Sequence, residues 1–518
     1  MDTLFVNGNI YSLESLSPPF EAMLVRNGWV IGLGTTAELR NQATGANEVD
    51  LQGYTVLPSF TDAHIHFLNY GLGLGRLQLD NCSLQETLRR VQDAAVAADP
   101  GQWIVGRGFD FNTWDCGWPQ GQWLDEISTE HPIVLIAKDG HMVWLNRAAF
   151  AALDITVNTA NPKGGVIERD ESGRPSGLCK ETAADFVVRS LPEATEDEKL
   201  RALRTAIQDA YSYGITAVHT MEDSTTWRTW QQLRRQAHVQ FRGVLSAPAA
   251  QLNALLELGI QGGFGDEYLR FGGIKIFADG SLGSRTAWML EPYERDTQRG
   301  VIVTDEAELQ AMVSAANGSG IPVAVHAIGD AANRAVLNAI QAAGDTRLRN
   351  RLEHAQLISG ADIPRLRPLN IVASMQPTQC AMDRYMAETY WGERCRTIYP
   401  FRSLLDHGTL LAFGSDAPVE SPDVLLGLYS AVARKQWQEP HTDSWRAHEA
   451  ISLFEAVRAY TQGAAAAVGE DTYRGTLAPG KRADFILLNN DIFQDDVEIL
   501  KETQIEAVYF EGQPVHQR

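Results

Sequence analysis

Residues Thr55–Phe67, TVLPSFTDAHIHF, join a short apolar run to a pair of histidines. The run Thr55–Phe60 has the length and composition of a buried β-strand, and FTDAHIHF comes immediately after it. Residues two apart on an extended backbone point to the same side, roughly 7 Å apart, so His64 and His66 can converge on one cation. Two half-exposed histidines at a strand end would give the same local pattern, so the position of the pair in the fold decides between the two interpretations.

Seven further apolar runs follow, and they alternate with segments of helical periodicity such as EDEKLRALRTAIQDAYSYG and DAANRAVLNAIQAAG. The runs are Thr216–Thr220, Phe241–Leu245, Gly273–Phe277, Pro322–His326, Arg351–His354, Ile371–Ser374 and Leu410–Gly414. Repeated strand–helix units are typical of a parallel sheet, and eight of them close into a barrel. The sequence therefore predicts an α/β fold with a (β/α)8 TIM barrel over residues 58–474.

Both ends of the chain differ from this central part. Residues 1–57 contain short strand-like runs with turn residues between them, and residues 475–518 return to that style with ADFILLNN and EAVYFEGQPV. We expect the two ends to form one small β-sandwich. Residues 61–215 separate the first two barrel strands, which is too long for a βα connection, so about 70–190 is predicted to be a large insert that acts as a lid.

Composition and charge narrow the class of protein. The chain has 518 residues with 44 Lys and Arg against 65 Asp and Glu, a formal net charge of -21, which disfavours nucleic acid and anionic membranes as partners. Its five cysteines form no CxxC pair and are odd in number, which argues against a disulfide framework. The N-terminus has no signal-peptide pattern and no apolar run could span a bilayer, so we expect a cytoplasmic protein.

Four more metal-competent side chains stand at the carboxyl ends of other predicted strands: Lys275, His326, His354 and Asp416. Each alone is more often a structural polar group, but six such residues at the strand ends of one barrel indicate a metal site. Imidazoles and carboxylates hold Zn²⁺ while leaving a position for water, whose pKa then falls to about 7. We expect one or two divalent ions, with Asp416 both ligating metal and accepting a proton from the attacking water.

This pattern resembles the amidohydrolase superfamily over nearly the whole chain. The phrases KDGHMVWLN, IKIFADGSLGSRTA, HAIGDAAN and RLEHAQL are similar to the family 3 branch that contains N-substituted formamide deformylase. The resemblance implies that Lys275 is carboxylated and bridges two metals. It also implies that His141 polarises the scissile carbonyl and that Arg285 and Asp330 shape the pocket, although His141 could simply bond the backbone and the other two could brace loops.

Two further residues are weaker candidates for substrate contacts. His219 ends the second predicted strand and could reach the pocket without ligating metal. Trp114 belongs to an insert rich in aromatic residues, which favours an apolar or aromatic group on the substrate, although Trp is also ordinary core material.

The sequence therefore predicts a metal-dependent hydrolase that cleaves an amide-like or formamide-like, non-peptide carbon–nitrogen bond of a small molecule. Two alternatives stay open: a deaminase or cyclic-amide hydrolase of the same superfamily, and a ligand-binding or regulatory barrel without turnover. Lys275 favours hydrolysis over deamination, because the deaminases usually lack a lysine on strand four. A homodimer is compatible with the sequence.

Overall fold

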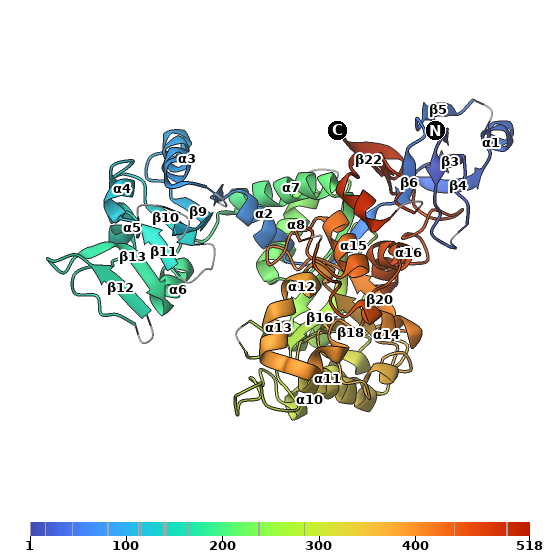
Figure 1. The fold of residues 1–518 in the computed structure, drawn as a ribbon. Coiled ribbons are helices and arrows are strands. Elements are labelled where there is room, and N and C mark those ends of the chain that lie inside the picture. The colour runs from blue at the N-terminus through green and yellow to red at the C-terminus, as the bar shows by residue number, and fades with distance from the viewer. Residues whose placement is uncertain are drawn as a thin grey trace. The chain divides into compact units, whose positions relative to one another are not determined.

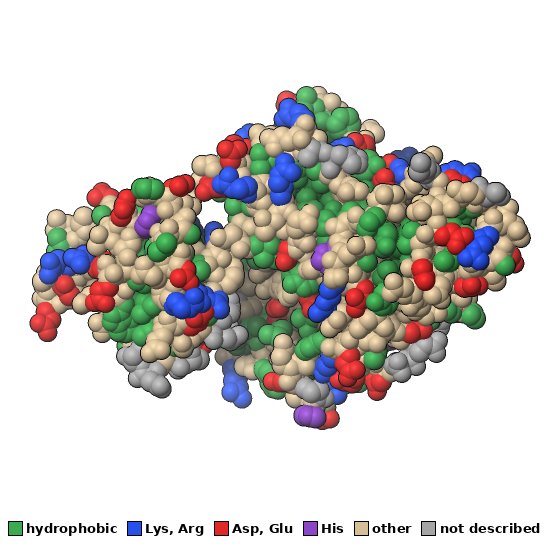
Figure 2. All heavy atoms as spheres, turned by 90° about the horizontal axis from the view of Figure 1, so that it is seen from above, with side chains coloured by type: hydrophobic (Ala, Val, Ile, Leu, Met, Phe, Trp, Pro, Cys, Tyr) green, Lys and Arg blue, Asp and Glu red, His purple; other side chains and the backbone are tan. Residues whose placement is uncertain are grey.

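The computed structural model describes residues 2–15, 17–43, 45–79, 82–111, 114, 117–137, 142–162, 165–236, 239–283, 285–439, 441–493 and 496–518. Two compact units are present, one built from Met1–Tyr70 with Leu203–Arg518, the other from Gly71–Ala202 (Figure 1). No helix among the described residues is long and apolar enough to cross a membrane. On the face shown in Figure 2, acidic and basic side chains are interspersed.

An eight-stranded parallel sheet forms the barrel of the larger unit, which confirms the predicted fold class. Its strands pair in chain order: β7 (Phe60–Ile65), β14 (Ile215–Thr220), β15 (Arg242–Pro248), β16 (Leu269–Phe277), β17 (Val323–Ala327), β18 (Arg351–His354), β19 (Val372–Met375) and β20 (Leu410–Phe413). Backbone hydrogen bonds join the first strand to the residues after the last: the Asp416 N–H donates to the His64 carbonyl at 2.7 Å, and the His66 N–H donates to Ala417 at 2.9 Å. The barrel is therefore nearly closed at this edge.

Helices follow the strands as the alternating pattern predicts. They are α7 (Glu196–Ser212), α8 (Ser224–Gln236), α9 (Leu252–Leu258), α10 (Glu306–Gly318), α11 (Asp330–Ala343), α12 (Pro377–Met382), α13 (Arg384–Trp391), α14 (Phe401–Asp406), α15 (Val424–Ala433), α16 (Leu453–Arg458) and α17 (Ala464–Ala467). Their starts have physical causes: Asp305 accepts the Glu308 N–H ahead of α10, and Asp423 accepts the Leu425 and Leu426 N–H groups ahead of α15.

The two chain ends combine into two small sheets, as expected. One sheet contains β2 (Asn9–Ile10), β6 (Thr55–Pro58), β21 (Phe485–Leu488), β22 (Ile505–Phe510) and β23 (Gln513–Gln517); the other contains β4 (Trp29–Gly34), β3 (Ala22–Arg26), β1 (Asp2–Val6) and β5 (Asn47–Asp50), beside α1 (Thr36–Gln42). Phe5 from the second sheet packs edge-on against Phe485 of the first at 5.0 Å, and Phe485 stacks on Tyr509 at 4.4 Å. A shared aromatic core therefore holds the N- and C-terminal segments together.

One predicted strand was wrong. Thr55–Pro58 is not the first barrel strand but β6 of the terminal sheet, where it pairs with β2 and β21. The chain changes sheet at Ser59, whose N–H donates to Asp484 in the terminal segment, while the next N–H, of Phe60, donates to Gly214 ahead of β14. A short apolar run has the same appearance in either sheet, so its partners decide the assignment. His64 consequently lies inside the first barrel strand, and His66 directly after it.

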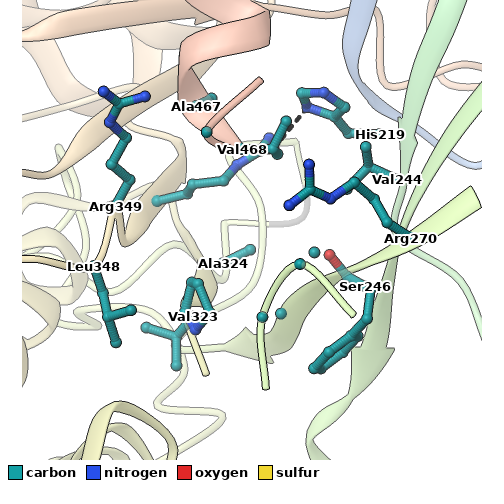
Figure 3. A pocket seen from close by; sticks show the side chains of 18 of the residues that line it. His219, Val244, Ser246, Arg270, Val323, Ala324, Leu348, Arg349, Ala467 and Val468 are labelled. Atoms are coloured by element: carbon teal, nitrogen blue, oxygen red, sulfur yellow. Dashed lines mark hydrogen bonds between the residues drawn. The ribbon is translucent and has the colours of Figure 1, made fainter. Parts of the chain in front are cut away.

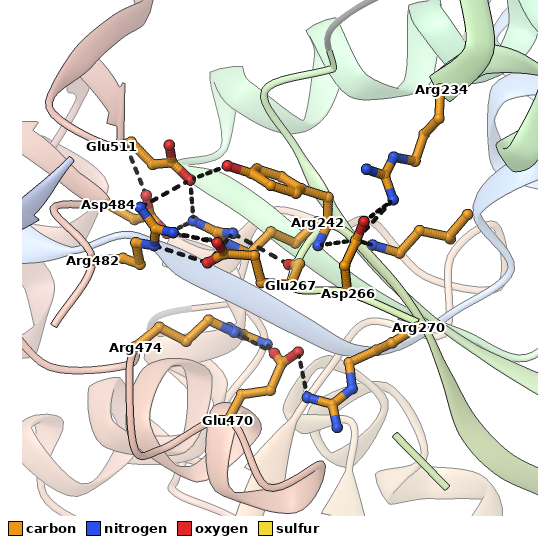
Figure 4. A network of polar contacts seen from close by, with 12 residues as sticks. Arg234, Arg242, Asp266, Glu267, Arg270, Glu470, Arg474, Arg482, Asp484 and Glu511 are labelled. Carbon is orange, nitrogen blue, oxygen red and sulfur yellow. Dashed lines mark hydrogen bonds and ion pairs between the residues drawn. The ribbon is translucent and has the colours of Figure 1, made fainter. Parts of the chain in front are cut away.

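A buried ion network joins the barrel to the terminal sheet (Figure 4). Arg242 at the start of β15 is 1% exposed, and its Nη2 donates to Asp484 at 3.1 Å and to Glu511 at 3.0 Å. Both carboxylates come from the C-terminal segment, far from Arg242 in sequence. Removing the arginine would leave the two carboxylates close together with only Arg482, 3.7 Å from Glu511, as a nearby cation.

The smaller unit is the predicted insert. Its six-stranded sheet has the order β12 (Gly165–Arg169), β13 (Pro175–Glu181), β11 (Met142–Leu145), β10 (Ile133–Ala137), β9 (Ile104–Phe109) and β8 (Leu77–Gln78). Helices α3 (Leu84–Ala97), α4 (Gly121–Asp125), α5 (Arg147–Ala152) and α6 (Thr182–Arg189) accompany it, and α2 (Phe67–Leu74) runs from the larger unit into the insert. That the insert serves as a lid stays a prediction.

Candidate metal centre

The carboxyl ends of the barrel strands bring the six sequence-predicted side chains to one end of the barrel. The sheet register places Phe277 beside His326 and Ala327 beside His354, so β16, β17 and β18 end at one level. The His354 ring lies 4.5 Å from that of His326 and 4.8 Å from that of His64, measured between centroids. Three imidazoles from three strands therefore form one cluster.

His64, His66 and Asp416 offer ligand atoms that all lie within 4.8 Å of one another. Asp416 Oδ1 is 3.2 Å from His66 Nε2 and 3.6 Å from His64 Nε2. His64 is 1% exposed, yet its Nε2 has no hydrogen-bond partner among the described residues. A buried imidazole nitrogen without a partner, beside a carboxylate and a second imidazole, has the chemistry of a site for a divalent cation.

The tautomers of the three clustered histidines fit this interpretation. His64 Nδ1 lies 2.6 Å from Glu353, His354 Nδ1 lies 2.9 Å from the Gln376 side-chain oxygen, and His326 Nε2 lies 2.9 Å from the Gly280 carbonyl. Because these oxygens accept, each ring nitrogen must donate, and the other nitrogen of each ring keeps a lone pair. Histidine ligands of metals are typically held in this way by outer oxygens.

Burial keeps these imidazoles neutral. Desolvation, followed by the positive charge of Lys275, lowers the pKa of His326 to about 4. Desolvation also lowers the pKa of His64 and, further, that of His354. Neutral imidazole is the form that binds metal, so the site does not need to lose protons from these rings at neutral pH.

Asp416 is held in an uncommon backbone conformation, with a φ of 62°. Its N–H donates to His64, and Gln379 Nε2 donates to its Oδ2 at 3.3 Å. Burial raises the pKa of Asp416, but the hydrogen bond from His66 acts in the opposite direction and the pKa is lowered. The carboxylate is therefore ionised when it faces His64 and His66.

Lys275 is 4% exposed on β16, and its Nζ lies 5.0 Å from the centre of the Phe277 ring. Burial lowers its pKa to about 8, although the charges of Glu353 and Asp416 act in the opposite direction. A substantial neutral fraction therefore exists near neutral pH, and the neutral amine is the form that can react with CO₂.

Several supporting residues were missed by the sequence reasoning. Glu353 is fully buried and receives hydrogen bonds from Arg351 at 2.7 Å as well as contacting His64. Asp62 accepts from the Ser415 hydroxyl at 2.5 Å and ties β7 to the loop that carries Asp416. The signals were present as charged residues in apolar strands, the arginine and glutamate of RLEH and the aspartate of FTDAHIH, because a charge in a buried strand needs a partner.

The other described candidates make local contacts, and their predicted roles toward a substrate stay predictions. Arg285 is exposed, with its guanidinium 5.4 Å from the Tyr390 ring, and Asp330 accepts the Leu290 N–H at 2.8 Å. His219 is buried against Arg351. In the insert, the Trp114 indole donates to the Cys82 carbonyl at 3.0 Å within an aromatic core. His141 lies outside the described residues.

Comparison with known proteins assigns the family. Residues 47–516 match the model of the amidohydrolase family, so the chain belongs to that family. It is 35% identical to protein LONG AFTER FAR-RED 3 of Arabidopsis thaliana, covering 99% of this chain and 91% of that protein, and 32% identical to the putative amidohydrolase YtcJ of Bacillus subtilis, covering both in full.

Two further similarities support the resemblance seen in the sequence. The N-substituted formamide deformylase of Arthrobacter pascens is 28% identical, over 99% of this chain and 97% of that enzyme. A crystal structure of an uncharacterized metal-dependent hydrolase from Pyrococcus furiosus superposes with a TM-score of 0.80 at 26% identity, covering 95% of this chain and all of the other. The chain is a hydrolase of the metal-dependent amidohydrolase superfamily.

Proposed function

We propose that this protein hydrolyses an amide-like or formamide-like, non-peptide carbon–nitrogen bond of a small molecule, using one or two divalent cations, with Zn²⁺ as the expected metal. One observation carries the proposal: the imidazoles of His64, His354 and the half-buried His326 each donate one ring N–H to a fixed oxygen and keep the other nitrogen available, beside the Asp416 carboxylate. Without a bound cation, the buried His64 Nε2 would lie beside the carboxylate with no hydrogen-bond partner among the described residues, which is unfavourable.

The proposed ligands are His64, His66, Lys275, His326, His354 and Asp416. A bound divalent cation would supply Lewis acidity and bring the pKa of water to about 7. Asp416 would accept the proton of the attacking water and return it to the leaving nitrogen, since its carboxylate is ionised and its oxygens lie beside the ligand cluster. Lys275 is proposed to be carboxylated, and His141 to polarise the scissile carbonyl.

The substrate is proposed to carry an apolar or aromatic group. Exposed apolar side chains follow the carboxyl ends of three barrel strands: Phe277, Met382, Tyr385 and Val419. Phe277 is 45% exposed although it lies two residues from the buried Lys275. Exposed apolar residues beside polar catalytic groups suit a ligand that is partly hydrophobic. Contacts from Arg285, Asp330, His219 and Trp114, a cytoplasmic location and a homodimer stay predictions.

The experiment combines metal analysis with a substrate screen. Purified protein is analysed for bound metals and assayed with N-formyl, N-acyl and cyclic amides and with amino-substituted heterocycles, next to Asp416→Asn and the matched control Asp305→Asn. We expect about one to two divalent ions per chain and a loss of turnover by several orders of magnitude in Asp416→Asn alone.

Other outcomes identify the alternatives. Ammonia release from heterocycles would indicate a deaminase, ring opening a cyclic-amide hydrolase, and tight metal binding without any turnover a ligand-binding barrel. A metal-free protein with normal hydrolysis would end the proposal.

A further inference from the structure

A cavity of about 370 Å³ lies at the N-terminal ends of the barrel strands, the ends opposite to those that carry the candidate metal ligands (Figure 3). This volume is within the roughly 300–1,000 Å³ of typical small-molecule sites. Strands β15, β16 and β17 and the segment leading into β18 supply its walls, which include Val244, Ser246, Arg270, Val323, Arg349 and Arg351. None of the six proposed metal ligands is among its lining residues.

The charge of the lining is unusual for this chain. Four arginines, Arg270, Arg347, Arg349 and Arg351, line the cavity, and Asp471 is its one acidic lining residue among those described. The whole chain carries a formal net charge of -21. A concave surface lined mainly by guanidinium groups concentrates positive potential and attracts anions.

Some of these guanidinium groups are already balanced. Arg351 donates to Glu353, and Arg349 donates to Asp471 at 2.8 Å. Arg347, which is 90% exposed at the rim, pairs with Asp345. Arg270 does not have a carboxylate of its own. Its Nη1 donates to the buried Glu470 at 3.3 Å, and Glu470 is also paired with Arg474. Two guanidinium groups therefore share one carboxylate.

Local structure places Arg270 against the cavity wall. A Cβ atom at Gly263, whose φ is 85°, would lie 2.5 Å from Arg270 Nη2, so only glycine allows the guanidinium to lie there. In Figure 3 the side chains of Arg270 and Ser246 extend from neighbouring strands toward the same space. A cationic group and a hydroxyl are thus presented together.

His219 closes part of the cavity wall. Arg351 Nη1 lies 2.9 Å from His219 Nδ1, and because arginine only donates, Nδ1 must accept. Burial and then the charge of Arg351 lower the pKa of His219 well below its usual range, so the ring is neutral and carries its proton on Nε2. Nε2 is buried and has no hydrogen-bond partner among the described residues. Because this nitrogen is closed off from solvent, His219 forms part of the cavity wall beside Arg351 and offers no contact to a ligand.

From these contacts we infer that the cavity binds a small molecule through an oxyanion, a phosphate or carboxylate group, with Arg270 and Ser246 as the polar contacts. Water in the cavity would not balance the positive charge that remains when Arg270 and Arg474 share the single carboxylate of Glu470. The N-terminal face of a barrel usually serves stability, so a ligand site here would be separate from catalysis.

Titration calorimetry on the full-length, metal-loaded protein tests this inference. Inorganic phosphate and acetate are titrated separately at constant ionic strength. Two variants address the cavity: Arg270→Gln removes the charge, and Val468→Trp fills the space from a half-buried lining position while leaving every charge in place. Val96→Trp, at an exposed valine of the insert, is the matched control, and Asp416→Asn reports anions bound at the candidate metal centre.

We expect saturable one-site binding of at least one anion, weakened about tenfold or more by both cavity variants and changed by less than about twofold in the two other proteins. The tighter of the two anions identifies the group. Two results would overturn the inference: neither anion binds saturably, or binding is lost in Asp416→Asn and unchanged in Val468→Trp. If Arg270→Gln does not fold, Val468→Trp still decides.

Discussion

Replacing Glu353 by Gln separates metal positioning from stability. Both carboxylate oxygens are in use: Oε1 accepts from Arg351, and Oε2 accepts from His64 at 2.6 Å and from Arg351 at 3.2 Å. An amide of the same shape must direct its NH₂ at one of these donors. His64 then loses either its orientation or the charge that favours its tautomer.

The expected magnitude follows from these contacts. Loss of an outer partner of a histidine ligand typically weakens metal binding about 10–100-fold, or about 1.4–2.7 kcal/mol. Because Arg351 is 5% exposed and would lose its carboxylate, the free energy of unfolding should also fall, by up to about 3–5 kcal/mol. Metal affinity is measured by competition with a chelator, and stability by urea unfolding of the metal-free protein.

Glu470→Gln is the matched control, because Glu470 is 1% exposed and also holds guanidinium groups, those of Arg270 and Arg474. It should lose comparable stability with unchanged metal affinity. Equal metal affinity in Glu353→Gln and the wild type, or an equal loss of metal affinity in both variants, would refute the role given to Glu353.

Three further predictions follow from single features of the structure. The pKa of Lys275 is about 8, so the neutral amine is about fivefold more abundant at pH 8 than at pH 7. Metal-free protein that is given bicarbonate and Zn²⁺ should therefore recover activity about fivefold faster at pH 8, which is measured in a time course at fixed dissolved CO₂. Gly414→Ala places a Cβ atom 2.4 Å from the backbone nitrogen of His64. It should lower the free energy of unfolding in urea by about 1–3 kcal/mol or more and reduce the metal content. Arg242→Ala leaves Asp484 and Glu511 without their shared cation and should cost about 3–5 kcal/mol in the same assay, with metal content unchanged in the protein that remains folded.

Each of these predictions has a result that contradicts it. A recovery rate that does not change between pH 7 and pH 8 would show that reactivation does not depend on the neutral amine of Lys275. Wild-type stability in Gly414→Ala would mean that the contact between the first strand and the loop after the last is not tight. Unchanged unfolding in Arg242→Ala would show that the network between barrel and terminal sheet contributes nothing to stability.

Local patterns in the sequence were enough to locate seven of the eight barrel strands, but not the first. Arg351–His354 was predicted with the bounds that the structure has, and the helix over 330–344 agrees with α11 to within one residue. Strand and helix periodicities are properties of neighbouring residues, so they can be read without knowing the partners. The six polar residues at strand ends followed, because parallel strands in a barrel end at one face.

Contacts between distant segments could not be obtained in this way. Thr55–Pro58 joins the terminal sheet because β2 and β21 lie on either side of it, which its own four residues do not encode. The bond between Glu353 and His64 and the cavity around Arg270 likewise join strands that are far apart in the chain. The sequence by itself determined which residues could be strands and which side chains could bind metal; only tertiary packing decided which strands became neighbours and which buried charges balance one another, because burial and pairing depend on the whole fold.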